Sequence, residues 1–244
     1  MRKNLFLTLS LASLLLLSCG KDRPSVAAQR EARQQHNLRE LERQQRSLAY
    51  CDSLIQVLQS QVQELMPLFK YEKQDQYEDH GRYVHRLLRT GSNASRCYLQ
   101  AYATDAFRLI VKGYYVGERP LHLQAIELQA DSLNQRFVGS AHPFSVEDVV
   151  PGYSPTTLHY EIITLDEPSG TDLLKLIDAC SGTRERISLA GKKSSSRFYL
   201  SDTDKKALVE TYRLATLMKD IHRLEQQAEQ ASLQIQKYQN RLTK

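Results

Sequence analysis

The fold is decided by residues 97–116, which read CYLQAYATDAFRLIVKGYYV. Aromatic and β-branched residues recur in both halves of this stretch, and the polar Asp105 lies between the halves. That composition is typical of neighbouring β-strands, which favour side chains that pack on a pleated surface. We therefore predict two strands, Cys97–Thr104 and Phe107–Val116.

The same composition continues outward over residues 67–200, a region that holds most of the 13 tyrosines. It predicts a β-rich, mainly antiparallel domain with five further strands: Arg82–Leu87, Leu121–Ala130, Leu158–Leu165, Ile187–Ala190 and Arg197–Leu200. Short loops that contain glycine predict two hairpins, one turning at Gly117–Pro120 and the other at Gly191–Ser195.

One helix is expected inside this domain, over Thr171–Cys180. Thr171 or Ser169 can cap its first turn, and Gly182 can end it. Its apolar side consists of Leu173, Leu174, Leu176 and Ile177.

Heptad patterns flank the domain on both sides. Residues 28–66 carry Leu41, Leu48, Ile55 and Val62 at one heptad position and Cys51, Leu58 and Leu65 at the other, with an interruption at Gln44. Pro67 ends or kinks this helix. Residues 201–244 repeat the pattern with Leu214, Ile221, Ala228, Ile235 and Leu242, and with Leu217, Leu224, Ala231 and Tyr238.

These patterns predict an α+β fold in which the two long helices form an antiparallel coiled-coil stalk that carries the central β domain. The seams can instead pair between chains, which would make a homo-oligomer. The sequence leaves both arrangements open.

The N-terminus resembles an export signal. Arg2 and Lys3 precede an apolar run, Leu5–Leu17, that is shorter than the roughly 20 residues a membrane-spanning helix needs. Leu16, Leu17, Ser18 and Cys19 match the lipobox of bacterial lipoproteins. This resemblance implies a signal peptide over residues 1–18, fatty acylation of Cys19, such as by palmitate, and a tether over residues 19–27.

Membrane attachment through lipid on Cys19 would place the protein in the bacterial envelope. Gly20, rather than aspartate, follows the cysteine, which by analogy with lipoprotein sorting favours the outer membrane. Its periplasmic and surface sides both remain open.

Composition restricts the functional classes. The chain of 244 residues has a formal net charge of +5, and its basic and acidic residues alternate, so we expect no nucleic-acid partner. The mean hydropathy of -0.50 and the absence of tryptophan indicate a modest core. In an oxidising compartment, Cys97 and Cys180 are a candidate disulfide, and Cys51 is the remaining thiol.

Two groups of basic and aromatic residues are candidate binding surfaces, since arginine and tyrosine are favoured interface anchors. The first group is Arg82, Tyr83, His85, Arg86 and Arg89, and the second is Tyr114, Tyr115 and Arg119. A tyrosine-rich sheet that packs its own core is the alternative explanation for both groups.

No nucleotide-binding loop, zinc-protease motif, nucleophile elbow or CxxC pair occurs in the sequence. We predict no catalytic residues, cofactor or metal site, although His80 and His85 beside Glu78 and Asp79 are a weak metal candidate. Asp166 and Glu167 are better explained by a turn before the internal helix.

The layout as a whole resembles a recurring group of uncharacterised envelope lipoproteins. The resemblance lies in Cys19, a Gln-rich helix, the tail from Asp202, and two short runs: Tyr77, Glu78, Asp79, Gly81, Tyr83, Val84 and His85, then Tyr98, Leu99, Ala101 and Tyr102. It implies a location in the envelope and an arrangement of helices around a β domain, and it implies no activity.

We therefore predict a membrane-anchored, non-enzymatic binding or scaffolding component of the envelope, whose partner is another envelope protein or a glycan. Two alternatives remain open: a hydrolase of envelope polymers with a dispersed active site, and a purely structural spacer.

Overall fold

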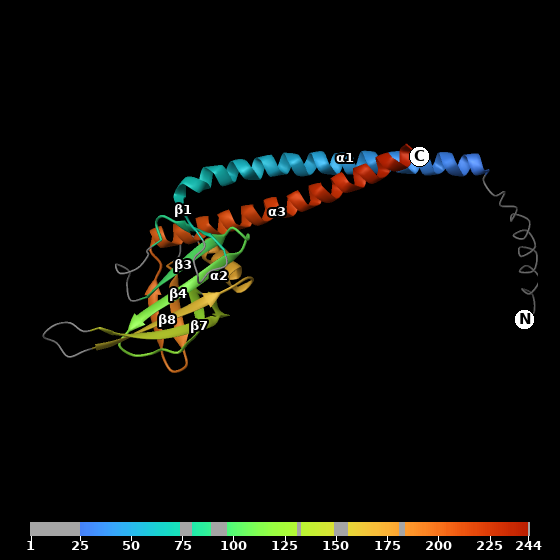
Figure 1. Ribbon diagram of the computed structural model, residues 1–244. Coiled ribbons are helices and arrows are strands. Elements are labelled where there is room, and N and C mark those ends of the chain that lie inside the picture. The colour runs from blue at the N-terminus through green and yellow to red at the C-terminus, as the bar shows by residue number, and fades with distance from the viewer. Residues whose placement is uncertain are drawn as a thin grey trace, which may run out of the picture. The chain divides into compact units, whose positions relative to one another are not determined.

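The computed structural model describes residues 25–73, 80–88, 97–130, 133–148, 156–180 and 184–243 (Figure 1). The chain divides into two compact units. One consists of Met1–Tyr50 and Ala228–Lys244, and the other of Cys51–Gln227. The second unit contains both β-sheets.

The described strands form two antiparallel sheets, which confirms the predicted α+β class. The first sheet has the order β1 (Phe69–Glu72), β2 (Arg82–His85), β3 (Cys97–Thr104), β4 (Leu109–Gly117), β8 (Thr156–Leu165) and β7 (Ser140–Asp148). The second has the order β10 (Ser195–Tyr199), β9 (Arg186–Gly191), β5 (Leu123–Ala130) and β6 (Leu133–Val138). All seven predicted strands are confirmed, whereas β1, β6 and β7 were missed.

The core lies between the two sheets. Alternate residues of each strand point to one face, and the facing sets form the core, in which Val111 of β4 and Ile126 of β5 are fully buried. Gly113 allows a close approach, because a Cβ there would lie 2.8 Å from Cδ2 of Leu189. Helix α2 (Ser169–Ala179) adds its buried apolar side to the same core.

The internal helix is confirmed, but its predicted cap is wrong. Pro168, after a cis peptide bond from Glu167, occupies the N-cap position, and no side chain caps the helix there. Asp166 and Glu167 lie in the approach to this turn, as predicted. Gly182 lies outside the described residues.

One of the two predicted hairpins is confirmed. β9 pairs with β10 through the turn after Gly191. The hairpin at Gly117–Pro120 is wrong, because β4 belongs to the first sheet and β5 to the second. A buried carboxylate on β8 binds the backbone N–H groups after Pro120, so the chain crosses between sheets here instead of folding back.

The prediction of a coiled-coil stalk is also wrong. Both long helices exist, as α1 (Val26–Leu65) and α3 (Asp202–Leu242), but they do not form a coiled-coil pair. Such a pair would bury the heptad positions along both helices. In α1 the one buried residue is Cys51, and the other predicted seam positions reach only intermediate burial.

The apolar pattern near the sheets has a different cause. Leu208 and Leu214 of α3 are fully buried members of the β-domain core, and Val62 and Leu65 of α1 pack against that core. Part of the heptad signal therefore reports the helix face that packs on the sheets. After α1, a short 3-10 helix, η1 (Met66–Leu68), contains Pro67, so the predicted end of the first helix is confirmed.

Candidate functional site

The second predicted binding group is divided by the sheet. Tyr114 and Tyr115 are neighbours on β4, and successive residues of a strand point to opposite faces. Tyr115 lies on the same face as its paired residues Cys97 and Glu161, toward the second sheet. Tyr114 lies on the outer face, so only Tyr115 and Arg119 of this group belong to one site.

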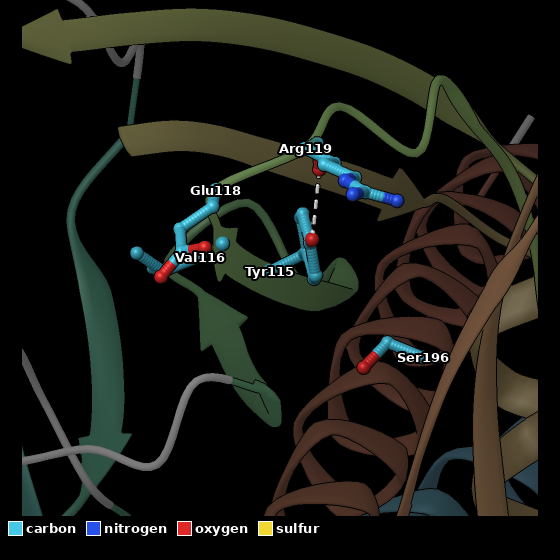
Figure 2. Close-up of a pocket in the computed structure, with 6 residues that line it drawn as sticks. Tyr115, Val116, Glu118, Arg119 and Ser196 are labelled. Carbon is cyan, nitrogen blue, oxygen red and sulfur yellow. Dashed lines mark hydrogen bonds between the residues drawn. The ribbon is translucent and has the colours of Figure 1, made fainter. Parts of the chain in front are cut away.

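Tyr115 and Arg119 line an open pocket of about 370 Å³, within the usual size range of small-ligand sites. The β4 end and the following loop supply Tyr115, Val116, Gly117, Glu118 and Arg119, and β10 supplies Ser196. Figure 2 shows the side chains of Glu118 and Arg119 leaving the loop in different directions. The pocket therefore has residues from both sheets and a charged rim.

Hydrogen bonds hold the pocket's polar side chains in place. The Tyr115 hydroxyl donates to the backbone oxygen of Arg119 at 2.8 Å, as Figure 2 shows. Ser196 Oγ lies 2.9 Å from Cys97 Sγ, which joins the two sheets. Glu118 and Arg119 are exposed, so their charged groups are accessible to a ligand.

The loop behind the pocket depends on Glu161. This carboxylate is buried, and it accepts the N–H groups of Leu121 at 2.5 Å, His122 at 3.0 Å and Leu123 at 2.7 Å. His122 has a φ of 56°, which the three hydrogen bonds around it stabilise. Glu161 therefore holds the crossing between sheets and, with it, the position of Arg119. Glu161 lies in the middle of an apolar run, and nothing in the sequence there marks it as the acceptor for a distant loop.

A tyrosine cluster covers the outer face of the first sheet. The rings of Tyr98 and Tyr114 stack at 4.6 Å, and the Tyr114 hydroxyl donates to Gln100 Oε1 at 3.0 Å. Arg82 and Lys112 each lie 5.2 Å from the centre of the Tyr102 ring. The two-residue spacing of Tyr98, Gln100 and Tyr102 in the sequence could have revealed this cluster.

Burial raises the pKa of Tyr114 to about 12, from its usual value near 10, because desolvation disfavours the phenolate. As the pH rises, the unfolded chain loses the Tyr114 proton before the folded chain does. The stability that the buried, neutral Tyr114 contributes is therefore fully present below pH about 10 and is lost as the pH rises through about 12. A titration of the tyrosinate absorbance band should show a component near pH 12 that Tyr114→Phe removes. Tyr50→Phe should leave that component unchanged, and its persistence in Tyr114→Phe would contradict the assignment.

The first predicted binding group is not a continuous surface. His85 is buried: its Nε2 lies 2.8 Å from Glu210 Oε2, and its Nδ1 accepts the N–H of Leu87 at 3.2 Å. Because Nδ1 accepts from the backbone, Nε2 is the ring nitrogen that can donate to Glu210 on α3. His85 therefore joins β2 to the helix and is unsuited to bind a ligand at the surface.

The other members of that group are divided between faces. Arg82 donates from Nε to Glu72 at 2.8 Å on the outer face, whereas Tyr83 packs against the core. Arg86 is exposed and donates to the backbone oxygen of Pro67 at 3.1 Å. Arg89 lies outside the described residues.

Three of the four cysteines, Cys51, Cys97 and Cys180, lie in the described residues. Cys51 and Cys97 are buried, and Cys180 follows α2. The bridge between Cys97 and Cys180 stays a prediction.

The weak metal candidate is not assembled in the described residues. His80 is exposed, with Nδ1 at 3.5 Å from Asp105 Oδ1, whereas His85 is held against α3. Glu78 and Asp79 lie outside the described residues. In the part of the chain that the structure covers, histidine, cysteine and carboxylate side chains form no group of three that could hold a metal ion.

Comparison with protein-family models, curated proteins and solved structures gives no match to this chain. Among the described helices, none has the length and apolar character to cross a bilayer. The site must therefore be interpreted from its own geometry.

Proposed function

We propose that the protein is a lipid-anchored binding component of the bacterial envelope. The proposed membrane attachment is supported by the charged N-terminus, the apolar run that follows it and the lipobox Leu16–Cys19. Acylation of a cysteine supplies several kcal/mol of membrane affinity per chain, at about 0.8 kcal/mol for each buried methylene. The outer membrane is the proposed location, by analogy with lipoprotein sorting.

The binding role is carried by the pocket between the sheets. Arg119 lines this pocket together with Tyr115 and Ser196, and the hydroxyl groups of Tyr115 and Ser196 are already held by hydrogen bonds. A planar guanidinium forms bidentate hydrogen bonds with carboxylate and phosphate groups. Because these hydroxyl groups are already held in place, less side-chain entropy is lost when a ligand binds. We therefore propose an envelope glycan or protein whose exposed anionic group enters this pocket.

Replacing the lipobox cysteine tests the proposed membrane attachment. Cys19→Ala should release the protein from membranes or leave an unprocessed precursor, because acylation requires the thiol. Metabolic labelling with a fatty-acid analogue, followed by fractionation, measures both effects. Equal labelling of the wild type and Cys19→Ala would exclude lipidation at this residue.

Replacing the pocket arginine tests the binding role. In crosslinked cells, affinity capture of the wild type should recover a reproducible envelope component, and Arg119→Ala should recover at least about ten-fold less. The loss follows from one charge-assisted hydrogen bond, worth about 1.5–3 kcal/mol. Arg213→Ala removes another exposed arginine, on α3, and is the matched control. Undiminished recovery with Arg119→Ala would contradict the pocket.

A further inference from the structure

The pairing of the strands shows which residues share the outer face of the second sheet. Three rows of paired residues cross its four strands on the side away from the core. They are Tyr199, Arg186, Gln129 and Asn134; then Arg197, Ser188, Glu127 and Arg136; then Ser195, Ala190, Ala125 and Val138. We call these residues the basic face. At about 4.8 Å per strand, it is roughly 14 Å wide.

This face carries an excess of positive charge. Arg136, Arg186 and Arg197 lie on it, and among its residues only Glu127 is acidic. Glu127 neutralises one arginine, since its Oε1 accepts from Arg136 at 2.6 Å. Beside the face, Arg184 lies 4.2 Å from the centre of the Tyr199 ring. Lys192 and Lys193 add two exposed charges in the adjoining turn.

Two further observations indicate that the basic face contacts something outside the chain. Val138 is 70% exposed and Tyr199 is 50% exposed, so an aliphatic and an aromatic side chain stand among the arginines. Between Arg197 and Glu127, the Ser188 hydroxyl is buried and has no hydrogen-bond partner in the described part of the chain. A buried hydroxyl without a partner is unfavourable, and a bound oxyanion could satisfy it.

We propose that the basic face binds an anionic phospholipid surface, with headgroup phosphates held by Arg186 and Arg197. Guanidinium groups bind phosphate bidentately, and each basic residue near an anionic membrane surface strengthens binding about five-fold. Tyrosine is favoured at the boundary between headgroups and acyl chains. A sheet face with dispersed charges can contact several headgroups at once.

The choice of a lipid surface rests on the proposed lipid anchor, because a second membrane contact is useful to a protein already held there. Vesicle binding by a protein that lacks the lipid anchor tests the basic face independently of that anchor. The full chain carrying Cys19→Ala is mixed with phosphatidylcholine vesicles, or with vesicles that also contain phosphatidylglycerol, and bound protein is measured by sedimentation. All variants share the same N-terminal segment, so its contribution cancels in the comparison.

Arg186→Gln with Arg197→Gln should lower the partition coefficient onto phosphatidylglycerol vesicles by about 25-fold, with little change on phosphatidylcholine. Arg213→Gln with Arg223→Gln on α3 removes the same charge and should change it less than two-fold. Val138→Asp alters an exposed side chain, so it should weaken vesicle binding while the protein stays folded.

Equal losses for both arginine pairs would show that only net charge matters and would overturn the proposal. So would binding to soluble polyphosphate with no preference for phosphatidylglycerol vesicles. If the vesicle results hold while Cys19 is not acylated, the basic face stands and the proposed anchor fails.

Discussion

Glu161→Ala should destabilise the β domain by about 3–5 kcal/mol, because it leaves three backbone N–H groups without their acceptor. Each unsatisfied buried donor costs about 1–3 kcal/mol, and two of the three donors, at Leu121 and Leu123, are buried. Glu161→Gln retains one carbonyl oxygen and should lose less. Urea denaturation followed by circular dichroism measures the free energy of unfolding.

Glu118→Ala is the matched control for this experiment. Glu118 lies on the same connection between β4 and β5, but it is exposed and its removal should change stability by less than about 0.5 kcal/mol. If Glu161→Ala proved as mild as Glu118→Ala, the carboxylate would not hold the crossing between sheets.

Leu214→Ala should also be strongly destabilising, by about 2.7–5 kcal/mol, the range observed when a buried leucine is truncated and leaves a cavity. Leu214 is fully buried in the core that α3 shares with the sheets. The unfolding midpoint in urea should fall while the slope of the transition stays constant, because the native surface changes little.

Leu233→Ala makes the same truncation on the same helix at a side chain that is 58% exposed. Its effect should stay within about 0.5 kcal/mol. Similar losses at Leu214 and Leu233 would show that burial in the β-domain core does not distinguish the two positions.

Local sequence patterns were sufficient for most of the secondary structure. Cys97–Thr104 was located to the residue, because β-branched and aromatic side chains mark a strand strongly. β6 was missed because Asn134, Gln135 and Arg136 read as a polar loop, whereas the strand exposes them on the sheet surface. β7 contains Pro143, which is compatible with an edge strand but weakens the pattern.

The arrangement of the elements was less predictable. A heptad pattern does not say whether a helix packs on another helix or on a sheet, and α3 uses Leu208 and Leu214 for the second purpose. The crossing after Gly117 depends on Glu161, a residue about 40 positions along the chain. Such long-range pairing leaves no local signal.

The candidate site was predicted in part. Tyr115 and Arg119 were identified from composition, but Ser196 comes from a distant strand. His85 was assigned to a surface because its acceptor, Glu210, is remote in sequence. The basic face was missed for a related reason. Charges that alternate along the chain are sorted by strand alternation, which collects Arg136, Arg186 and Arg197 on one side.

The position of α3 in the core has a consequence for the order in which the protein can fold. Phe69, near the start of the β domain, and Leu208 and Leu214, close to the C-terminus, belong to one core cluster. During synthesis the sheets emerge first, and their apolar face remains incomplete until α3 is available. A nascent chain that lacks α3 therefore exposes the apolar surface that Leu208 and Leu214 cover in the complete domain.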